Sequence, residues 1–153
     1  MKVIFLDIDG VLSTYRDLHK ELENNPNKKI KIDTIFDRPT LLLKEIIDKT
    51  DAKIVLSSSW RITHLDKAIE ALKEYGISIY DVTPYLRKIR GEEIKAWLSK
   101  NDYVESFIII DDDSDMGELM DYLIQTNNYY GLEEEHVEKA IKLLNKNIKR
   151  LYR

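Results

Sequence analysis

Apolar residues in this chain follow two patterns: short continuous runs, and longer stretches with apolar positions three and four residues apart. The continuous runs predict strands that are buried on both faces of a sheet. They cover Lys2 to Leu6, Ala52 to Leu56, Ile77 to Val82, Ser106 to Ile110 and Leu123 to Thr126. The longer stretches predict helices. These comprise a helix that begins at Pro39, then His64 to Tyr75, Gly91 to Lys100, Met116 to Tyr122 and Glu133 to Asn147.

Strands that alternate with helices indicate parallel βαβ units. We therefore predict an α/β fold, a doubly wound three-layer sandwich around a mainly parallel five-stranded sheet. The length of 153 residues suits one domain with a single core. We accordingly assign residues 1–153 to one domain.

The segment from about residue 13 to residue 38 lies outside this alternation. It is long enough for a flap with one extra hairpin or helix, but too short for a full additional domain. Within it, Lys28-Lys29-Ile30-Lys31-Ile32 alternates between polar and apolar, which predicts a half-exposed strand. We expect this segment to form a flap or a minimal cap.

Polar residues follow three of the predicted strands. Asp7-Ile8-Asp9-Gly10 follows the first strand, Ser57-Ser58-Ser59-Trp60-Arg61 the second, and Asp111-Asp112-Asp113 the fourth. In a doubly wound sheet, ligands bind beyond the carboxyl ends of the strands. Parallel neighbours would bring at least four carboxylates together there, and like charges so close need a cation or a shared proton.

Each of these pieces also has a purely structural interpretation. An isolated Asp at a strand end often caps a helix or turn. Ser58 and Ser59 could form an ordinary loop that caps the next helix, and Trp60 could either anchor the rim of the core or stack on a base. The pairing of Asp-x-Asp-Gly with a second acidic cluster, each directly after a buried strand, favours a functional site.

The composition of the chain limits the metals and partners that the site could bind. Carboxylate oxygens suit Mg²⁺, whereas a chain with no cysteine and three scattered histidines is a poor zinc binder. The net charge of −4 argues against a protein that coats duplex DNA. No apolar run approaches the roughly 20 residues that span a bilayer, and nothing at the start resembles a signal peptide. We therefore predict no membrane segment and a cytoplasmic location.

The same polar residues resemble the four motifs of the haloacid dehalogenase (HAD) superfamily. Asp7-Ile8-Asp9-Gly10-Val11-Leu12 resembles motif one, Ser57 motif two and Asp111-Asp112 motif four. Arg90-Gly91-Glu92-Glu93-Ile94 lies where the family places its motif-three Lys or Arg. Arg90 fits that position best, with Lys88 and Lys95 as alternatives.

A closer likeness is to the small HAD domains associated with Swiss Army Knife RNA repair proteins. It is carried by four groups of residues: Leu56 to Arg61, Arg90 to Ile94 with Trp97-Leu98, Asp111 to Asp113, and Gln125-Thr126 with Gly131-Leu132.

The resemblance implies a magnesium-dependent phosphomonoester hydrolase that works through an aspartyl-phosphate. Asp7 would be the nucleophile and Asp9 the acid and base. Ser57 and Arg90 would hold the phosphoryl oxygens. Asp7, the backbone carbonyl of Asp9, and Asp111 or Asp112 would hold Mg²⁺.

Substrate contacts are expected from residues around this centre, namely Gly10, Ser58, Trp60, Arg61 and Lys88. Lys28, Lys29, Lys31 and Arg61 could attract an anionic substrate to an open site. An open site favours the phosphorylated end of RNA or DNA, or a nucleotide. Two alternatives are a small-metabolite phosphatase or nucleotidase, and a non-catalytic HAD-fold module that binds or regulates a partner. The intact set of Asp7, Asp9 and Ser57 argues against the second alternative.

Overall fold

The computed structural model describes residues 1–31 and 33–146. Its strands are β1 (Lys2–Leu6), β2 (Lys53–Leu56), β3 (Ile79–Val82), β4 (Ser106–Asp111) and β5 (Leu123–Gln125). Its helices are α1 (Tyr15–Asn24), α2 (Asp37–Thr50), α3 (Trp60–Thr63), α4 (Leu65–Lys73), α5 (Arg90–Ser99), the 3₁₀ helix η1 (Gly117–Tyr122) and α6 (Glu134–Leu144).

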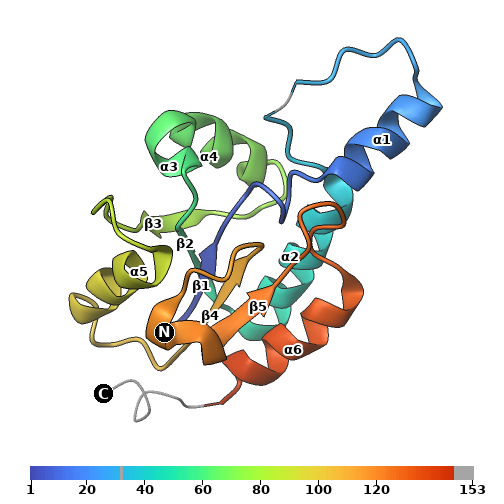
Figure 1. The fold of residues 1–153 in the computed structure, drawn as a ribbon. Helices are drawn as coiled ribbons and strands as arrows, with labels where there is room; N and C mark the ends of the chain where they lie inside the picture. Colours follow the sequence, from blue (N-terminus) through green and yellow to red (C-terminus); the bar gives the residue numbers. More distant parts are fainter. Residues whose placement is uncertain (32, 147–153) are drawn as a thin grey trace.

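All five strands are parallel and lie in the order β3-β2-β1-β4-β5 (Figure 1). The chain builds the sheet outward from β1 to β3, then crosses to the other side of β1 to form β4 and β5. The strand order therefore reverses between β1 and β4, which is where doubly wound sheets bind their ligands. The predicted fold class is confirmed.

Apolar side chains cover the sheet on both faces. Successive residues of β1 point to opposite faces, so Ile4 and Leu6 belong to one core cluster, and Val3 and Phe5 to another. Helices α2, α4 and α6 complete the first cluster, while α5 and η1 complete the second. On the second face, the ring of Trp97 meets Phe5 edge-on at 5.4 Å. The sheet and the helices that pack on its two faces through these clusters form the predicted three layers.

Three predicted helix boundaries differ from the structure by two residues or more. α2 begins at Asp37, two residues before Pro39. Proline is tolerated throughout the first turn because the N–H groups there have no acceptor within the helix. The predicted helix from His64 to Tyr75 ends at Lys73, where a tight turn at Gly76 (φ 73°) leads into Ile77. The final helix ends at Leu144, before the predicted last residue Asn147, which itself lies outside the described residues.

Within residues 13–38, α1 and the irregular segment 25–31 project from the body of the domain (Figure 1). The strand predicted for Lys28 to Ile32 is wrong over its described part, since Lys28–Lys31 form no strand. An extended segment needs a partner strand for its backbone N–H and C=O groups. The Lys28 amide instead bonds to the carbonyl of Asn25 in a turn. Ile32 lies outside the described residues.

A double ion pair fixes α1 to the body of the domain. The Arg38 guanidinium donates to both carboxylate oxygens of Asp17, at 2.9 and 3.0 Å. It also donates to the backbone carbonyls of Tyr130 and Leu132, each at 2.7 Å. These contacts anchor α1 to the body of the domain. No helix in the described part of the chain is both long and apolar enough to cross a membrane.

Candidate active site

Carboxylates from β1 and β4 meet at the point where the strand order reverses. Leu6 pairs with Ile110 in the sheet, and the Asp7 amide donates to the Ile110 carbonyl at 3.0 Å. Asp7 and the pair Asp111–Asp112 consequently follow adjacent strand ends. Asp7, Asp111 and Asp112 each offer an oxygen, and these oxygens all lie within 4.8 Å of one another.

Burial raises the pKa of two of these carboxyls, and the charge of a neighbouring carboxylate adds to the effect. Burial, and then the charge of Asp111, raises the pKa of Asp7 from 3.8 to about 9. Burial is also the largest cause for Asp111, whose pKa rises to about 6, while the amide of Asp113 and the charge of Arg90 act in the opposite direction. A pair that resists ionisation this strongly needs more positive charge than Arg90 provides.

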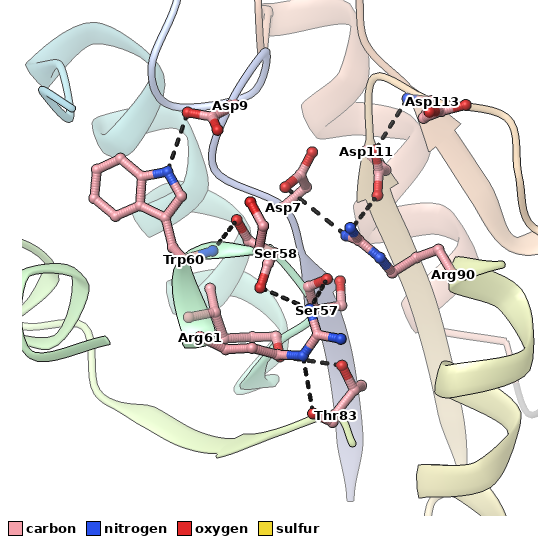
Figure 2. Close-up of polar contacts among 12 residues, drawn as sticks. Asp7, Asp9, Ser57, Ser58, Trp60, Arg61, Thr83, Arg90, Asp111 and Asp113 are labelled. Atoms are coloured by element: carbon pink, nitrogen blue, oxygen red, sulfur yellow. Dashed lines mark hydrogen bonds and ion pairs between the residues drawn. The ribbon is translucent and has the colours of Figure 1, made fainter. Parts of the chain in front are cut away.

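Arg90 is the cation that reaches these carboxylates (Figure 2). Its Nη1 lies 3.3 Å from Asp111 Oδ2 and 3.9 Å from Asp7 Oδ1. Of the two alternatives, Lys88 is exposed on the preceding loop, and Lys95 pairs with Glu118 at 2.8 Å. The geometry therefore favours Arg90 for the motif-three position.

A close approach of backbone to backbone fixes the start of α5, which carries Arg90. A Cβ on Gly91 would lie only 2.1 Å from the Met116 carbonyl oxygen, so only glycine allows the helix to pack this close to the loop after β4. The Arg90 amide faces the Asp115 carboxylate at 3.3 Å. The acidic residues after β4 thus also stabilise the N-terminus of α5.

Ser57 lies beside Asp7 because β2 and β1 are neighbours. Its amide donates to the Leu6 carbonyl at 2.9 Å. Its Oγ is fully buried and makes no hydrogen bond with any described residue. An unpaired buried hydroxyl costs about 1–3 kcal/mol, which a phosphoryl oxygen in this position would recover.

Ser58 makes the structural contact that the sequence left open. Its side chain is buried, and its Oγ accepts a hydrogen bond from the Trp60 amide at 3.1 Å. This contact stabilises the turn into α3.

Trp60 is an anchor rather than a stacking surface. Only 4% of the residue is exposed, which excludes stacking on a substrate base. Its Nε1–H donates to Asp9 Oδ1 at 3.1 Å, as Figure 2 shows. The exposed Asp9 carboxylate is thereby held by one oxygen, and its other oxygen stays available.

Gly10 allows Asp112 to approach the loop after β1. Gly10 has a φ of 78°, and a Cβ there would lie 2.5 Å from Asp112 Oδ2. Thr126, after β5, fixes the same loop by donating from Oγ1 to the Gly10 carbonyl at 2.7 Å. Gln125 donates to the Asp112 carbonyl at 3.2 Å. Sequence reasoning noted Gln125 and Thr126 as part of the resemblance but did not assign them this positioning function.

Arg61 does not face a substrate, which corrects the sequence prediction. Its side chain is 4% exposed and pairs with the equally buried Glu93 at 2.9 Å. The guanidinium also donates to the backbone carbonyls of Ser57, Ser58, Thr83 and Pro84. Burial lowers the pKa of Arg61, and the charge of Glu93 counteracts this. The pair ties the loop of Ser57 to the helix of Arg90.

Comparison with known families agrees with this arrangement. The model of a family described as the HAD domain in Swiss Army Knife RNA repair proteins matches residues 3–137. The chain belongs to this family. Neither the curated proteins nor the solved structures gave a match. Membership confirms the resemblance seen in the sequence and supports a HAD-type phosphohydrolase in general terms.

The acidic group of this HAD domain fits a hard divalent cation. Asp7, Asp111 and Asp112 present oxygen ligands within 4.8 Å of one another, and such oxygens are preferred by Mg²⁺ and Ca²⁺. Burial raises the pKa of Asp7 and Asp111, and a bound cation would oppose this effect by favouring the ionised carboxylates.

A first prediction concerns the stability of the metal-free HAD domain. Because the folded-state pKa values of Asp7 and Asp111 exceed 3.8, the folded protein binds more protons than the unfolded chain above that pH. Stability should therefore fall as the pH rises through about 6 and about 9. Asp7→Asn should weaken this pH dependence and raise Tm at pH 8 by at least ~3 °C, about 1 kcal/mol for a domain of this size.

Thermal unfolding in EDTA between pH 5 and pH 9 measures this effect. The exposed Asp121→Asn is the matched control and should follow the wild-type curve. Parallel curves for Asp7→Asn and wild type would show that repulsion at Asp7 does not limit stability.

A second prediction concerns the buried pair. Glu93→Gln leaves the buried charge of Arg61 unpaired, so we expect the free energy of unfolding to fall by about 3 kcal/mol in urea titrations. The matched control is Glu118→Gln, which breaks a solvent-exposed pair with Lys95 and should change stability little. Equal effects of the two variants would refute a structural function of the Arg61–Glu93 pair.

Proposed function

We propose that this chain is a magnesium-dependent phosphomonoester hydrolase that forms an aspartyl-phosphate on Asp7. Its substrates would be phosphorylated ends of RNA or DNA, or nucleotides. The observation that carries the proposal is the surroundings of Asp7. Together with Asp111 and Asp112, Asp7 forms a set of carboxylates that fits a cation. Asp7 also lies beside two groups that could bind a phosphate, the Arg90 guanidinium and the unpartnered hydroxyl of Ser57.

In the first step, a carboxylate oxygen of Asp7 attacks phosphorus in line and the bond to the leaving oxygen breaks. Asp9 gives its proton to that oxygen. In the second step, Asp9 takes a proton from water, whose oxygen attacks phosphorus and releases Asp7 and inorganic phosphate. The hydrogen bond from Trp60 to Asp9 Oδ1 orients the carboxyl for both transfers.

Ser57 and Arg90 stabilise the charge that spreads over the phosphoryl oxygens in the transition state. Asp7, the Asp9 carbonyl, and Asp111 or Asp112 would hold Mg²⁺. When bound, Mg²⁺ would neutralise the repulsion between the Asp7 carboxylate and the incoming phosphate. It would also keep Asp7 ionised despite its burial.

Two observations support a nucleic-acid substrate. The family is described by its occurrence in RNA repair proteins. The insertion after β1, which would serve as the cap, is also small: its described part contains a single helix, α1. A substrate that is itself large would help to exclude water from the site. A cytoplasmic location remains a prediction from the sequence.

A third prediction tests the nucleophile. Asp7→Asn removes the attacking oxygen while it conserves the shape of the side chain. We expect magnesium-dependent release of phosphate from p-nitrophenyl phosphate to fall by at least ~10³-fold, about 4 kcal/mol. Asp113→Asn alters a neighbouring exposed carboxylate and is the matched control. A folded Asp7→Asn protein with near-wild-type turnover would rule out covalent catalysis by Asp7.

A fourth prediction tests the substrate class. Remote binding energy raises kcat/KM when a large substrate is held away from the reacting bond. We expect an oligonucleotide with a terminal phosphate to exceed the matching mononucleotide by at least ~10-fold in kcat/KM, about 1.4 kcal/mol. The advantage should shrink as salt rises, since the exposed Lys29 and Lys31 would attract the strand electrostatically. Equal efficiency at all salt concentrations would favour a small-metabolite phosphatase.

A further inference from the structure

A cavity of about 460 Å³ adjoins the candidate active site. Its lining includes the carboxylates of Asp9 and Asp112 as well as the side chains of Tyr15, Leu18 and Phe36. We propose that this cavity binds the nucleoside that carries the scissile phosphate, so that α1 recognises the leaving group. This proposal rests on the proposed function and specifies a substrate-binding site for it.

The position of Asp9 determines on which side the leaving group lies. In an in-line displacement, the leaving oxygen lies opposite the attacking oxygen of Asp7. The group that protonates it must lie within hydrogen-bond reach. The leaving group therefore extends into space that Asp9 lines, and this cavity provides that space next to the carboxylate group of Asp112.

A second cavity beside Asp9 fits less well. It has a volume of about 370 Å³ and is lined by Asp33, Trp60 and His64. It includes none of the three clustered carboxylates, and Trp60 is too buried to offer its ring face to a ligand. The cavity beneath α1 is the better candidate.

The chemistry of the cavity wall suits a nucleoside. Tyr15 is 56% exposed and offers an aromatic surface to a base or sugar. Asn128 and Ser13 add an amide and a hydroxyl that can exchange hydrogen bonds with polar ligand atoms. Cavities of roughly 300–1,000 Å³ hold small organic ligands, a range that includes a nucleoside.

Lys31 lies at the boundary between this cavity and a second one, along which a nucleic-acid strand could continue. Its side chain lines this cavity and also a neighbouring one of about 600 Å³, between α1 and residues 28–38. A cation at this boundary can contact the next phosphate of a strand whose terminal nucleoside occupies the first cavity. This arrangement favours an oligonucleotide over a free nucleotide.

Contacts within the protein hold the wall that carries Tyr15 in place. Asp17, two residues along α1, is held by the Arg38 guanidinium. The Arg16 amide donates to the Tyr129 carbonyl at 2.9 Å, which fixes the first turn from the opposite side. A wall fixed in this way binds a ligand without the cost of ordering a loop.

The test compares two substrates in wild type, Tyr15→Ala and Tyr15→Phe. One substrate is a short oligonucleotide with a terminal phosphate, and the other is acetyl phosphate, which carries no nucleoside. We expect Tyr15→Ala to lower the ratio of the two kcat/KM values at least tenfold, and Tyr15→Phe to preserve most of it. Tyr103→Ala is the matched control, since Tyr103 is 50% exposed and precedes β4 at the other end of the sheet.

A binding measurement separates a contact with the ligand from a change in the fold. In the Asp7→Asn background, fluorescence anisotropy should show at least tenfold weaker binding of the same oligonucleotide when Tyr15→Ala is added. An unchanged ratio and unchanged binding in Tyr15→Ala would overturn the inference while leaving the proposed function intact. If wild type hydrolysed neither the oligonucleotide nor acetyl phosphate, both this inference and the proposed function would be overturned.

Discussion

The repulsion between Asp7 and Asp111 is the constraint on which the site depends. The two carboxyls cannot move apart, because hydrogen bonds between β1 and β4 continue up to the amide of Asp7. The parallel register thus brings two carboxyls together in a buried place, where burial raises the pKa of both and the charge of Asp111 raises that of Asp7 further. Two apolar layers on the sheet offset this local instability. Such a site gains from any added cation.

The buried pair of Arg61 and Glu93 connects this electrostatic centre to the phosphate-binding groups. Arg61 holds the carbonyls of the loop that follows β2, and Glu93 lies one turn after Arg90 on α5. The position of the Ser57 hydroxyl and the position of the Arg90 guanidinium are therefore set by the same contact. A buried ion pair often adds little stability, so we interpret this one by what it positions.

The sequence predicted the sheet because each strand is a continuous apolar run, a pattern that depends on few distant contacts. It also placed the acidic residues at the correct strand ends. It left Trp60 open between a core anchor and a stacking surface, and it did not predict that Arg61 is buried, because a polar loop looks exposed until partners such as Glu93 are known. The strand expected at Lys28 to Ile32 was wrong over its described residues for a related reason. Local alternation does not supply a partner strand.

In the proposed mechanism, the cavity lined by Asp9, Asp112 and Tyr15 would give α1 a function in both chemical steps. In that mechanism, water would attack the aspartyl-phosphate from the side that the leaving group has vacated, because the second displacement would also be in line. Asp9 must then take a proton where it had earlier given one, so the vacated cavity is the place from which that water arrives. A bound nucleoside would exclude water during the first step and admit it after departure. A cap no larger than α1 suffices when the leaving group itself closes the site.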